Sequence, residues 1–504
     1  MEDGVRTRRL TIWRRSWFPV ALLTIAALVL RVAGLGGKSL WADEAYASGL
    51  MDMSLPQLIR LAIAGSPHPP LAFLFIRAST FLFGGSEMGL RAIPAIFSAL
   101  AVVPLTAIVS RRLGARTAIW AGALWVVSPF AVSLGQEAWL YGLTAFLGFL
   151  LVDVCDRAWH GAPWAYWTVV PLALLGMLVQ HLFAIYVAAG FGLYLAVPRE
   201  TRVPLRKPLI LAGLLAAFYA PFIPLLLKQG GFRAERIRRA GLDMSVVYAY
   251  RYLLRVPTVF ARLIPDGLLL QLGRHLLSDM KQLAFWAVFA LIDVFLILCL
   301  FLDRTLRRPL KVWLGLILAL PLVLFLKEDP TVRHLTVLWI PLAFGAAAAF
   351  RRYRATGPLT VLAAAVMLLP YYNVRSFPYH RSDWRGAVRY VERNLRPDEG
   401  ILVLGKLSGG LAWDYYSTSD QPRVALGGEN PYSERLEPGR DAQAVLDSIR
   451  ALHDRVWIVC DCWEAPGVDQ LLEGDSIFSQ RWVSPNMLVV HAGLAGEPDG
   501  SRLP

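Results

Sequence analysis

The chain of 504 residues is too apolar for a soluble globular protein, because 56% of its residues are hydrophobic and 17% are charged. Its formal net charge is +14. No nucleic-acid-binding motif accompanies this basic excess, so we expect no nucleic-acid partner and attribute much of the charge to membrane topology.

Long apolar runs with few charges recur along the chain, and each is long enough to cross a hydrocarbon core of ~30 Å as a helix. Eleven spans are predicted in this way, near 17–35, 89–109, 117–133, 138–155, 164–180, 182–197, 208–227, 282–302, 312–326, 335–350 and 357–372. The predicted fold class is therefore a polytopic α-helical membrane protein.

Lys and Arg are concentrated at the N-terminus and in alternate loops between these spans, which places them on one side of the membrane. Five arginines lie within the first 15 residues, and basic loops follow at 111–116, 199–207, 304–311 and 351–354. Because cytoplasmic loops carry such an excess, the N-terminus is predicted to be cytoplasmic. An odd number of spans then places residues 373–504 outside the cytoplasmic (inner) membrane.

Three of the predicted outer segments are longer than connectors need to be: 36–88, 228–281 and 373–504. The first contains an apolar stretch at about 70–84 that could span. Spanning would reverse the sidedness of every later loop, so we expect an interfacial helix there. The second segment is basic, which fits either attraction to anionic lipid headgroups or binding of a phosphate-bearing lipid.

The last outer segment, 373–504, is predicted to be an extracytoplasmic α/β domain, separate from a transmembrane domain at 1–372. Helical spacing favours helices at 382–395, capped by Ser382, and at 442–453. Short buried strands are predicted at 400–404, at 455–460 and near the run NMLVVHAG. The pair Cys460 and Cys462 is a weak metal or redox signal, and packing explains it better.

Two adjacent carboxylates, Asp43 and Glu44, lie in the stretch WADEAYASG just after the first span. Adjacent side chains diverge by about 100° on a helix, so one of the two would face a given substrate atom. A carboxylate here could act as a general base for a hydroxyl group. A helix cap or a solvated acid is the structural alternative.

Other outer loops supply further polar groups at a similar membrane depth. They are His68 in the first loop, Glu137 and Tyr141 in the loop after the third span, and Lys327, Arg333 and His334 after the ninth. Each alone is explained by a structural role. Their shared side of the membrane is what favours a common site.

Several stretches resemble the GT-C glycosyltransferase superfamily, on its bacterial branch similar to protein O-mannosyltransferases and to lipid A aminoarabinose transferases. They are WADEAYASG, SPHPPLAFLFIRASTFLFGG with the residues that follow it, SLGQEAWLYGL, VRHLTVLWIPLAFG and DWRGAVRYVERNLRPDEGILVL. The resemblance is good over roughly 15–200 and more diffuse beyond. The chain departs from the family pattern at Trp139 and His334, where the family often has Arg and Tyr.

The resemblance implies transfer of a sugar from a polyprenyl-phosphate donor to a hydroxyl of an envelope glycan, lipid or protein, with inversion. Asp43 would be the base, with Glu44 positioning the acceptor and Glu137 as a second acid. Arg333 would neutralise the departing phosphate, and His68 would lie near it. Lys327, His334 and Tyr141 are further candidates for donor binding. The sequence names no metal ligands, and it allows a divalent metal without requiring one.

A membrane transporter or lipid flippase is the competing class, because basic outer loops and Asp293 within a predicted span would serve it equally. Transporters usually hold polar groups near the midplane and show repeated halves. Here the acids lie at one face and no repeat is visible. A catalytically silent scaffold whose outer domain binds a partner is the third class.

Overall fold

The computed structural model describes residues 2–64, 69–159, 162–180, 183–196, 294–324, 336–372, 383–404, 409–426, 438–461, 476–484 and 487–493, with gaps at 52, 307 and 422, and a few isolated positions between 209 and 291. The chain divides into two compact units. Unit 1 comprises Met1–Ala33, Leu55–Ile76 and Arg91–Tyr371, and unit 2 comprises Gly34–Ser54, Arg77–Leu90 and Tyr372–Pro504.

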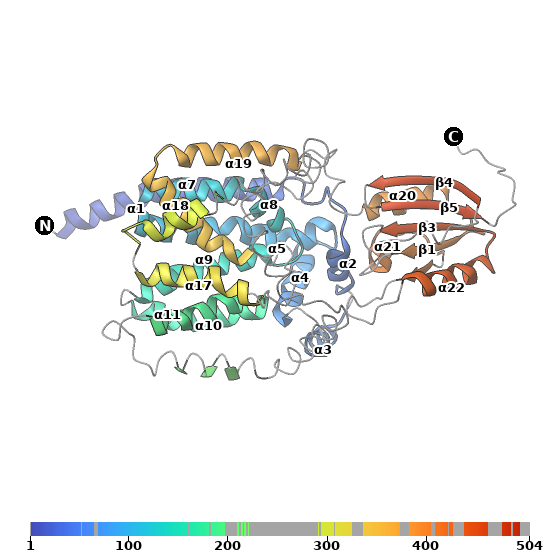
Figure 1. The fold of residues 1–504 in the computed structure, drawn as a ribbon, viewed down its shortest axis with the longest axis horizontal. Helices are drawn as coiled ribbons and strands as arrows, with labels where there is room; N and C mark the ends of the chain where they lie inside the picture. Colours follow the sequence, from blue (N-terminus) through green and yellow to red (C-terminus); the bar gives the residue numbers. More distant parts are fainter. Residues whose placement is uncertain are drawn as a thin grey trace. The chain divides into compact units, whose positions relative to one another are not determined.

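Unit 1 is helical. Its helices are α1 (Glu2–Val32), α3 (Leu55–Ala64), α6 (Val102–Leu113), α7 (Ala115–Val127), α8 (Pro129–Gly135), α9 (Tyr141–Trp159), α10 (Pro163–Val179), α11 (Ala184–Ala196), α17 (Arg308–Leu324), α18 (Trp339–Arg352) and α19 (Thr356–Tyr372). Helices α4 (Pro70–Phe83) and α5 (Glu87–Leu100) each contribute residues to both units. Helix α7 packs on α1, α6 and α18, and most of the long helices run in similar directions (Figure 1).

The core of unit 1 is aromatic where α7, α9 and α18 meet. The ring of Trp125 lies edge-on to both Phe149 and Trp339, with centroids 5.3 Å apart in each pair. Phe130 stacks against Trp339, with ring centroids 5.8 Å apart. Large buried rings of this kind supply much of the packing energy between helices.

The outward faces of some helices in unit 1 are apolar. On α19, Leu359, Leu362, Val366 and Leu369 recur at intervals of three or four residues, and each is 56–70% exposed. Helical spacing places such side chains on one face, and exposed apolar faces of this size suit hydrocarbon better than water.

Among the described residues, one continuous helical stretch, Glu87–Leu113, is long and apolar enough to cross a membrane by length and composition. Helices α7 and α8 make a second if they count as one span bent by 57°. Helices nonetheless occur at the predicted spans that the structure describes, whereas most of 208–227 and the first half of 282–302 lie outside the described residues. The count of eleven spans stays a prediction.

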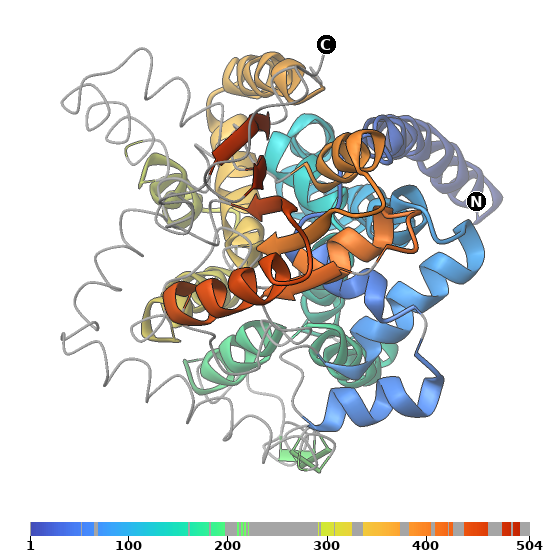
Figure 2. The same ribbon diagram turned by 90° about the vertical axis from the view of Figure 1, so that its right-hand side faces the viewer.

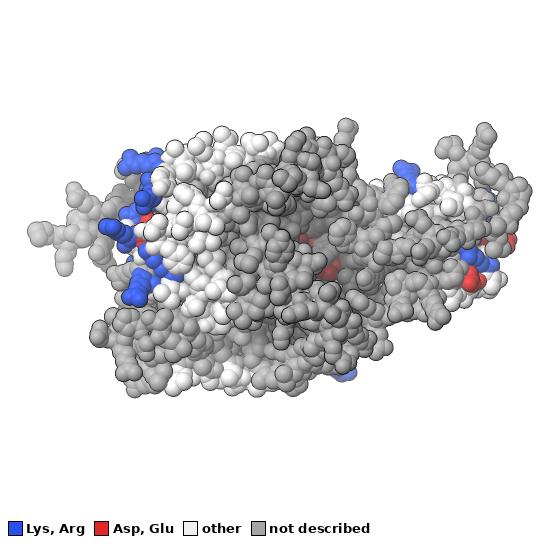
Figure 3. All heavy atoms as spheres, in the orientation of Figure 1, with Lys and Arg blue, Asp and Glu red and all other residues white. Residues whose placement is uncertain are grey.

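Lys and Arg side chains gather at one end of the helical unit, beyond a band of uncharged surface (Figure 3). Two arginines lie in the last turn of α6, and two more in the last turn of α18. Some of them pair with acids at the same end: Arg112 contacts Asp156 at 2.7 Å, and Arg111 contacts Asp153.

Unit 2 contains a five-stranded sheet in the order β2-β1-β3-β5-β4. The strands are β1 (Gly400–Leu404), β2 (Arg423–Leu426), β3 (Arg455–Asp461), β4 (Ser476–Ser484) and β5 (Met487–Gly493). Strand β1 pairs in parallel with β2 and β3, whereas β5 pairs antiparallel with β3 and β4. The predicted strands at 400–404 and 455–460 and near NMLVVHAG are confirmed.

Helices cover both faces of this sheet (Figure 2). Because side chains alternate along a strand, Leu402 packs on one face with α22 (Pro438–Arg450), and Ile401 packs on the other with α20 (Trp384–Asn394) and α21 (Gly409–Tyr416). The N-cap of α20 is Asp383, whose carboxylate accepts from the Gly386 amide at 3.0 Å. The predicted cap, Ser382, lies outside the described residues.

Two segments of the predicted first outer loop are part of unit 2. Helix α2 (Ala42–Gly49) packs on α21, and Ala45 lies in the same apolar cluster as Trp384 and Trp413. A Cβ atom at Gly49 would lie 3.3 Å from Leu411, so the two helices approach closely. The residues around the acid pair are therefore packed against the α/β fold, which the sequence patterns did not indicate.

Candidate functional site

Helix α2 carries Asp43 and Glu44 in its first turn. Acidic side chains are favourable there, because the amide groups of a helix N-terminus are partly positive. Trp41 provides the N-cap with an extended backbone, and its carbonyl accepts from the Ala45 amide at 2.8 Å. Glu44 is fully buried and Asp43 is partly exposed. Of the two carboxylates, Asp43 is thus the more accessible to a reactant.

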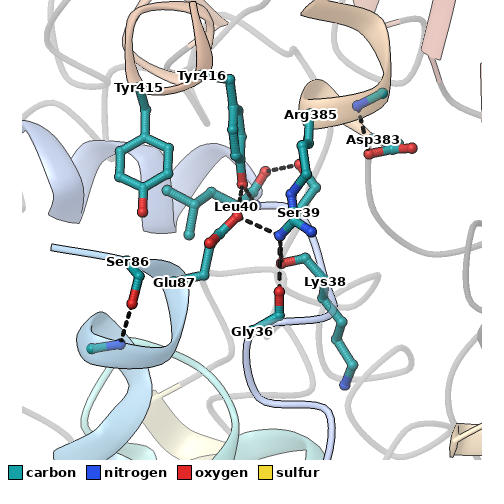
Figure 4. Close-up of polar contacts among 12 residues, drawn as sticks. Gly36, Lys38, Ser39, Leu40, Ser86, Glu87, Asp383, Arg385, Tyr415 and Tyr416 are labelled. Atoms are coloured by element: carbon teal, nitrogen blue, oxygen red, sulfur yellow. Dashed lines mark hydrogen bonds and ion pairs between the residues drawn. The ribbon is translucent and has the colours of Figure 1, made fainter. Parts of the chain in front are cut away.

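The chain enters α2 through a tightly held turn. Gly34 has a φ of +69°, a left-handed conformation that favours glycine, and its carbonyl accepts from the Gly37 amide at 3.0 Å. Further on, Ser39 Oγ accepts from the Arg385 amide at 3.1 Å, and the Leu40 amide donates to Tyr416 Oη at 2.7 Å. The turn is therefore bonded to α20 and α21 (Figure 4).

Glu87 lies at the centre of these contacts. Its Oε1 accepts from Tyr416 Oη at 2.9 Å and forms an ion pair with the Arg385 guanidinium. Burial raises the pKa of Tyr416 to about 12, so its hydroxyl keeps its proton at neutral pH. Burial alone would lower the pKa of Arg385, but Glu87 and Tyr416 together outweigh burial and the net shift of the pKa is upward.

In unit 1, Glu137 and Tyr141 lie at the junction of α8 and α9, and both are buried. The preceding residue, Gln136, fixes the junction to the end of α1. Its Nε2 donates to the carbonyls of Arg31 at 2.9 Å and Ala33 at 2.8 Å. The position of Glu137 thus depends on the end of the first helix.

A buried arginine at the end of α1 organises this region, and the sequence analysis did not single it out. Arg31 is 0% exposed, and its guanidinium donates to Ser98 Oγ at 2.7 Å and to the carbonyls of Trp125 at 3.0 Å and Val126 at 3.3 Å. The carbonyls of these two residues lie in the last turn of α7. There the chain bends into α8, and the regular pattern of helical hydrogen bonds stops. The signal was present, since Arg31 is the only charged residue between positions 17 and 35.

Four predicted site residues lie outside the described residues: His68, Lys327, Arg333 and His334. So do Asp293, Cys462 and the basic segment 228–281. The structure brings Asp43 and Glu44 together on α2 in unit 2, and Glu137 and Tyr141 together in unit 1. Within the described part of the chain, no group of three His, Cys, Asp or Glu side chains could hold a metal ion.

Comparison with known proteins adds three findings. Residues 67–227 match the family model described as dolichyl-phosphate-mannose-protein mannosyltransferase. No curated protein sequence matches the chain.

The third finding concerns the fold. The crystal structure of ArnT from Cupriavidus metallidurans bound to undecaprenyl phosphate is similar, with a TM-score of 0.53 and 14% identity, over 95% of this chain and 99% of that one. The apo state of the same protein gives a TM-score of 0.54 and 13% identity, over 96% and 98%. The fold that this chain shares with ArnT, together with the family match, confirms the predicted likeness to GT-C glycosyltransferases.

Proposed function

We propose that the protein is an inverting glycosyltransferase that moves a sugar from a polyprenyl-phosphate donor to a hydroxyl group on the outer face of the cytoplasmic membrane. The observation that carries this proposal is the likeness of fold over nearly the whole chain to ArnT, a protein seen bound to undecaprenyl phosphate. The family match over residues 67–227 supports the same reaction class.

In the proposed reaction, Asp43 accepts the proton of the acceptor hydroxyl while the oxygen of that hydroxyl attacks the anomeric carbon of the sugar. The bond from that carbon to the phosphate oxygen breaks, and polyprenyl phosphate leaves with the electron pair. Asp43 suits this role because it is partly exposed, whereas buried Glu44 is better placed to position a group beside it. Glu137 would be a second acid near the reactants.

The phosphate of the donor requires cations as charge develops on its leaving oxygen. Arg333 is the proposed principal cation, because guanidinium binds phosphate through two parallel bonds. Lys327, His334 and His68 would contribute further contacts, and Tyr141 would lie near the sugar. The acceptor would be a glycan, lipid or protein of the cell envelope.

The same proposal places the N-terminus in the cytoplasm and the α/β domain outside. The gathering of Lys and Arg at one end of unit 1 supports this sidedness, since basic residues concentrate on the cytoplasmic side of membrane proteins (Figure 3). The apolar outer face of α19 supports a location in the bilayer.

The test uses purified protein in liposomes with radiolabelled undecaprenyl-phosphate sugars and a membrane lipid extract as acceptor. We expect labelled product from a lipid-linked donor and none from the corresponding sugar nucleotide. Movement of the lipid-linked sugar between leaflets without any labelled product would reject the proposal and favour a flippase.

A further inference from the structure

We infer that Arg385 and Tyr416, two residues of the α/β domain, are positioning residues for the acid pair on α2. They hold the turn 36–40, which leads directly into the helix that bears Asp43. The inference rests on the proposed function, because it assigns the α/β domain a part in that reaction.

Arg385 binds this turn at several points at once. Its Nη2 donates to the carbonyls of Gly36 at 3.0 Å and Lys38 at 3.3 Å, and its backbone amide donates to Ser39 Oγ at 3.1 Å. The guanidinium also pairs with Glu87. A planar guanidinium with several fixed donors restrains a backbone segment more strongly than a single flexible cation would.

Tyr416 binds the residue closest to the helix. The Leu40 amide donates to Tyr416 Oη at 2.7 Å, and the same hydroxyl donates to Glu87 at 2.9 Å. Leu40 is fully buried, so its amide needs a partner within the protein. Leu40 precedes the first residue of α2, Ala42, by two positions.

The contacts form one connected network in Figure 4, where Glu87 Oε1 accepts hydrogen bonds from both Arg385 and Tyr416. Packing of α2 on α21, the helix that ends at Tyr416, adds a second restraint. A general base must be held closely against its reactant, because a displacement of ~1 Å can cost about a hundredfold in rate. By restraining the turn that leads into α2, the network thus holds Asp43 in a fixed position.

The cleanest perturbation is Tyr416→Phe, which removes the hydroxyl and keeps the ring. We expect kcat for sugar transfer to fall about fivefold, the rate equivalent of one hydrogen bond. The KM for the polyprenyl-phosphate donor should stay the same. Arg385→Gln should lower kcat further, about tenfold or more. Arg385→Lys should restore little of this kcat, because an ammonium group lacks the planar set of N–H donors of a guanidinium.

The matched control is Arg450→Gln. Arg450 lies on α22, which covers the face of the sheet opposite α20 and α21, and its Nη1 donates to Asp447 at 3.3 Å. The control thus breaks an arginine–carboxylate contact of the same unit on the other face of the sheet, and we expect wild-type kcat. Unfolding temperatures of all variants are measured in the same detergent.

A combination with Asp43→Asn separates positioning from general stability. If Tyr416 acts through Asp43, Tyr416→Phe should have no further effect on the residual single-turnover rate of Asp43→Asn protein. A wild-type kcat in Tyr416→Phe and Arg385→Gln would overturn the inference. An equal loss in both backgrounds, or an equal loss in Arg450→Gln protein, would also overturn it. Absence of transfer by the wild-type protein would instead reject the proposed function itself.

Discussion

Arg31 provides the sharpest test of how unit 1 holds its bent helix pair. In Arg31→Met, a side chain of similar length and no charge replaces the buried guanidinium. The bonds to Ser98 Oγ and to the last carbonyls of α7, those of Trp125 and Val126, are then lost. The two carbonyls remain buried without a charged donor. Removing one partner of a buried hydrogen bond costs more free energy than removing both, because the remaining polar group stays unsatisfied.

The magnitude follows from these three bonds between helices. Hydrogen bonds to charged groups contribute about 1.5–3 kcal/mol in soluble proteins, and polar contacts between membrane helices average about 0.6 kcal/mol. Three bonds predict a loss in the free energy of unfolding of roughly 2 kcal/mol at the membrane average, and of roughly 5 kcal/mol at the lower value for charged groups. Methionine fills most of the volume, so we expect little added cost from a cavity.

The assay is reversible unfolding in mixed micelles, followed by tryptophan fluorescence, with Val29→Met as the control. Val29 lies on the same helix and is 60% exposed, so the control should stay within about 0.5 kcal/mol of wild type. If Arg31→Met unfolds at the same denaturant concentration as the control, our account of the α7–α8 junction is refuted.

Two further predictions concern packing and pH. Gly142→Ala should destabilise unit 1 by about 1–3 kcal/mol in the same unfolding assay, because the new Cβ would overlap the carbonyl oxygen of Pro94 on α5; unchanged stability would show that α5 and α9 are not so close. Burial alone would raise the pKa of Glu399, but hydrogen bonds from His491 and Trp457 lower it below its ordinary value. This carboxylate therefore stabilises unit 2 above pH ~4.5 and stops doing so as pH falls through its folded pKa. Glu399→Gln should flatten the acid limb of stability against pH, and an equally steep limb would contradict this.

Local sequence patterns were sufficient for several elements of the α/β domain. The apolar run at 400–404 is strand β1, and the helical spacing at 382–395 corresponds to α20. Both elements bury a face whose periodicity is visible in the sequence. The edge strand β4, SIFSQRWVS, mixes polar and apolar residues and gave no such signal.

The surroundings of the acid pair could not be predicted in this way. The acids themselves stood out, because carboxylates next to an apolar run are costly. Their support comes from Tyr416, 376 positions away from Leu40, and from Arg385 on a different helix. Such contacts depend on how distant surfaces fit, and no local periodicity encodes them. The same holds for Arg31, whose partners lie on α5 and α7.

The most direct test of the central claim compares sugar transfer by wild-type and Asp43→Asn protein at saturating labelled polyprenyl-phosphate donor. Loss of a general base predicts a rate lower by about 10²–10⁴-fold, with donor binding and unfolding temperature unchanged. Transfer by Asp43→Asn protein at the wild-type rate would contradict the assignment of Asp43 as the base.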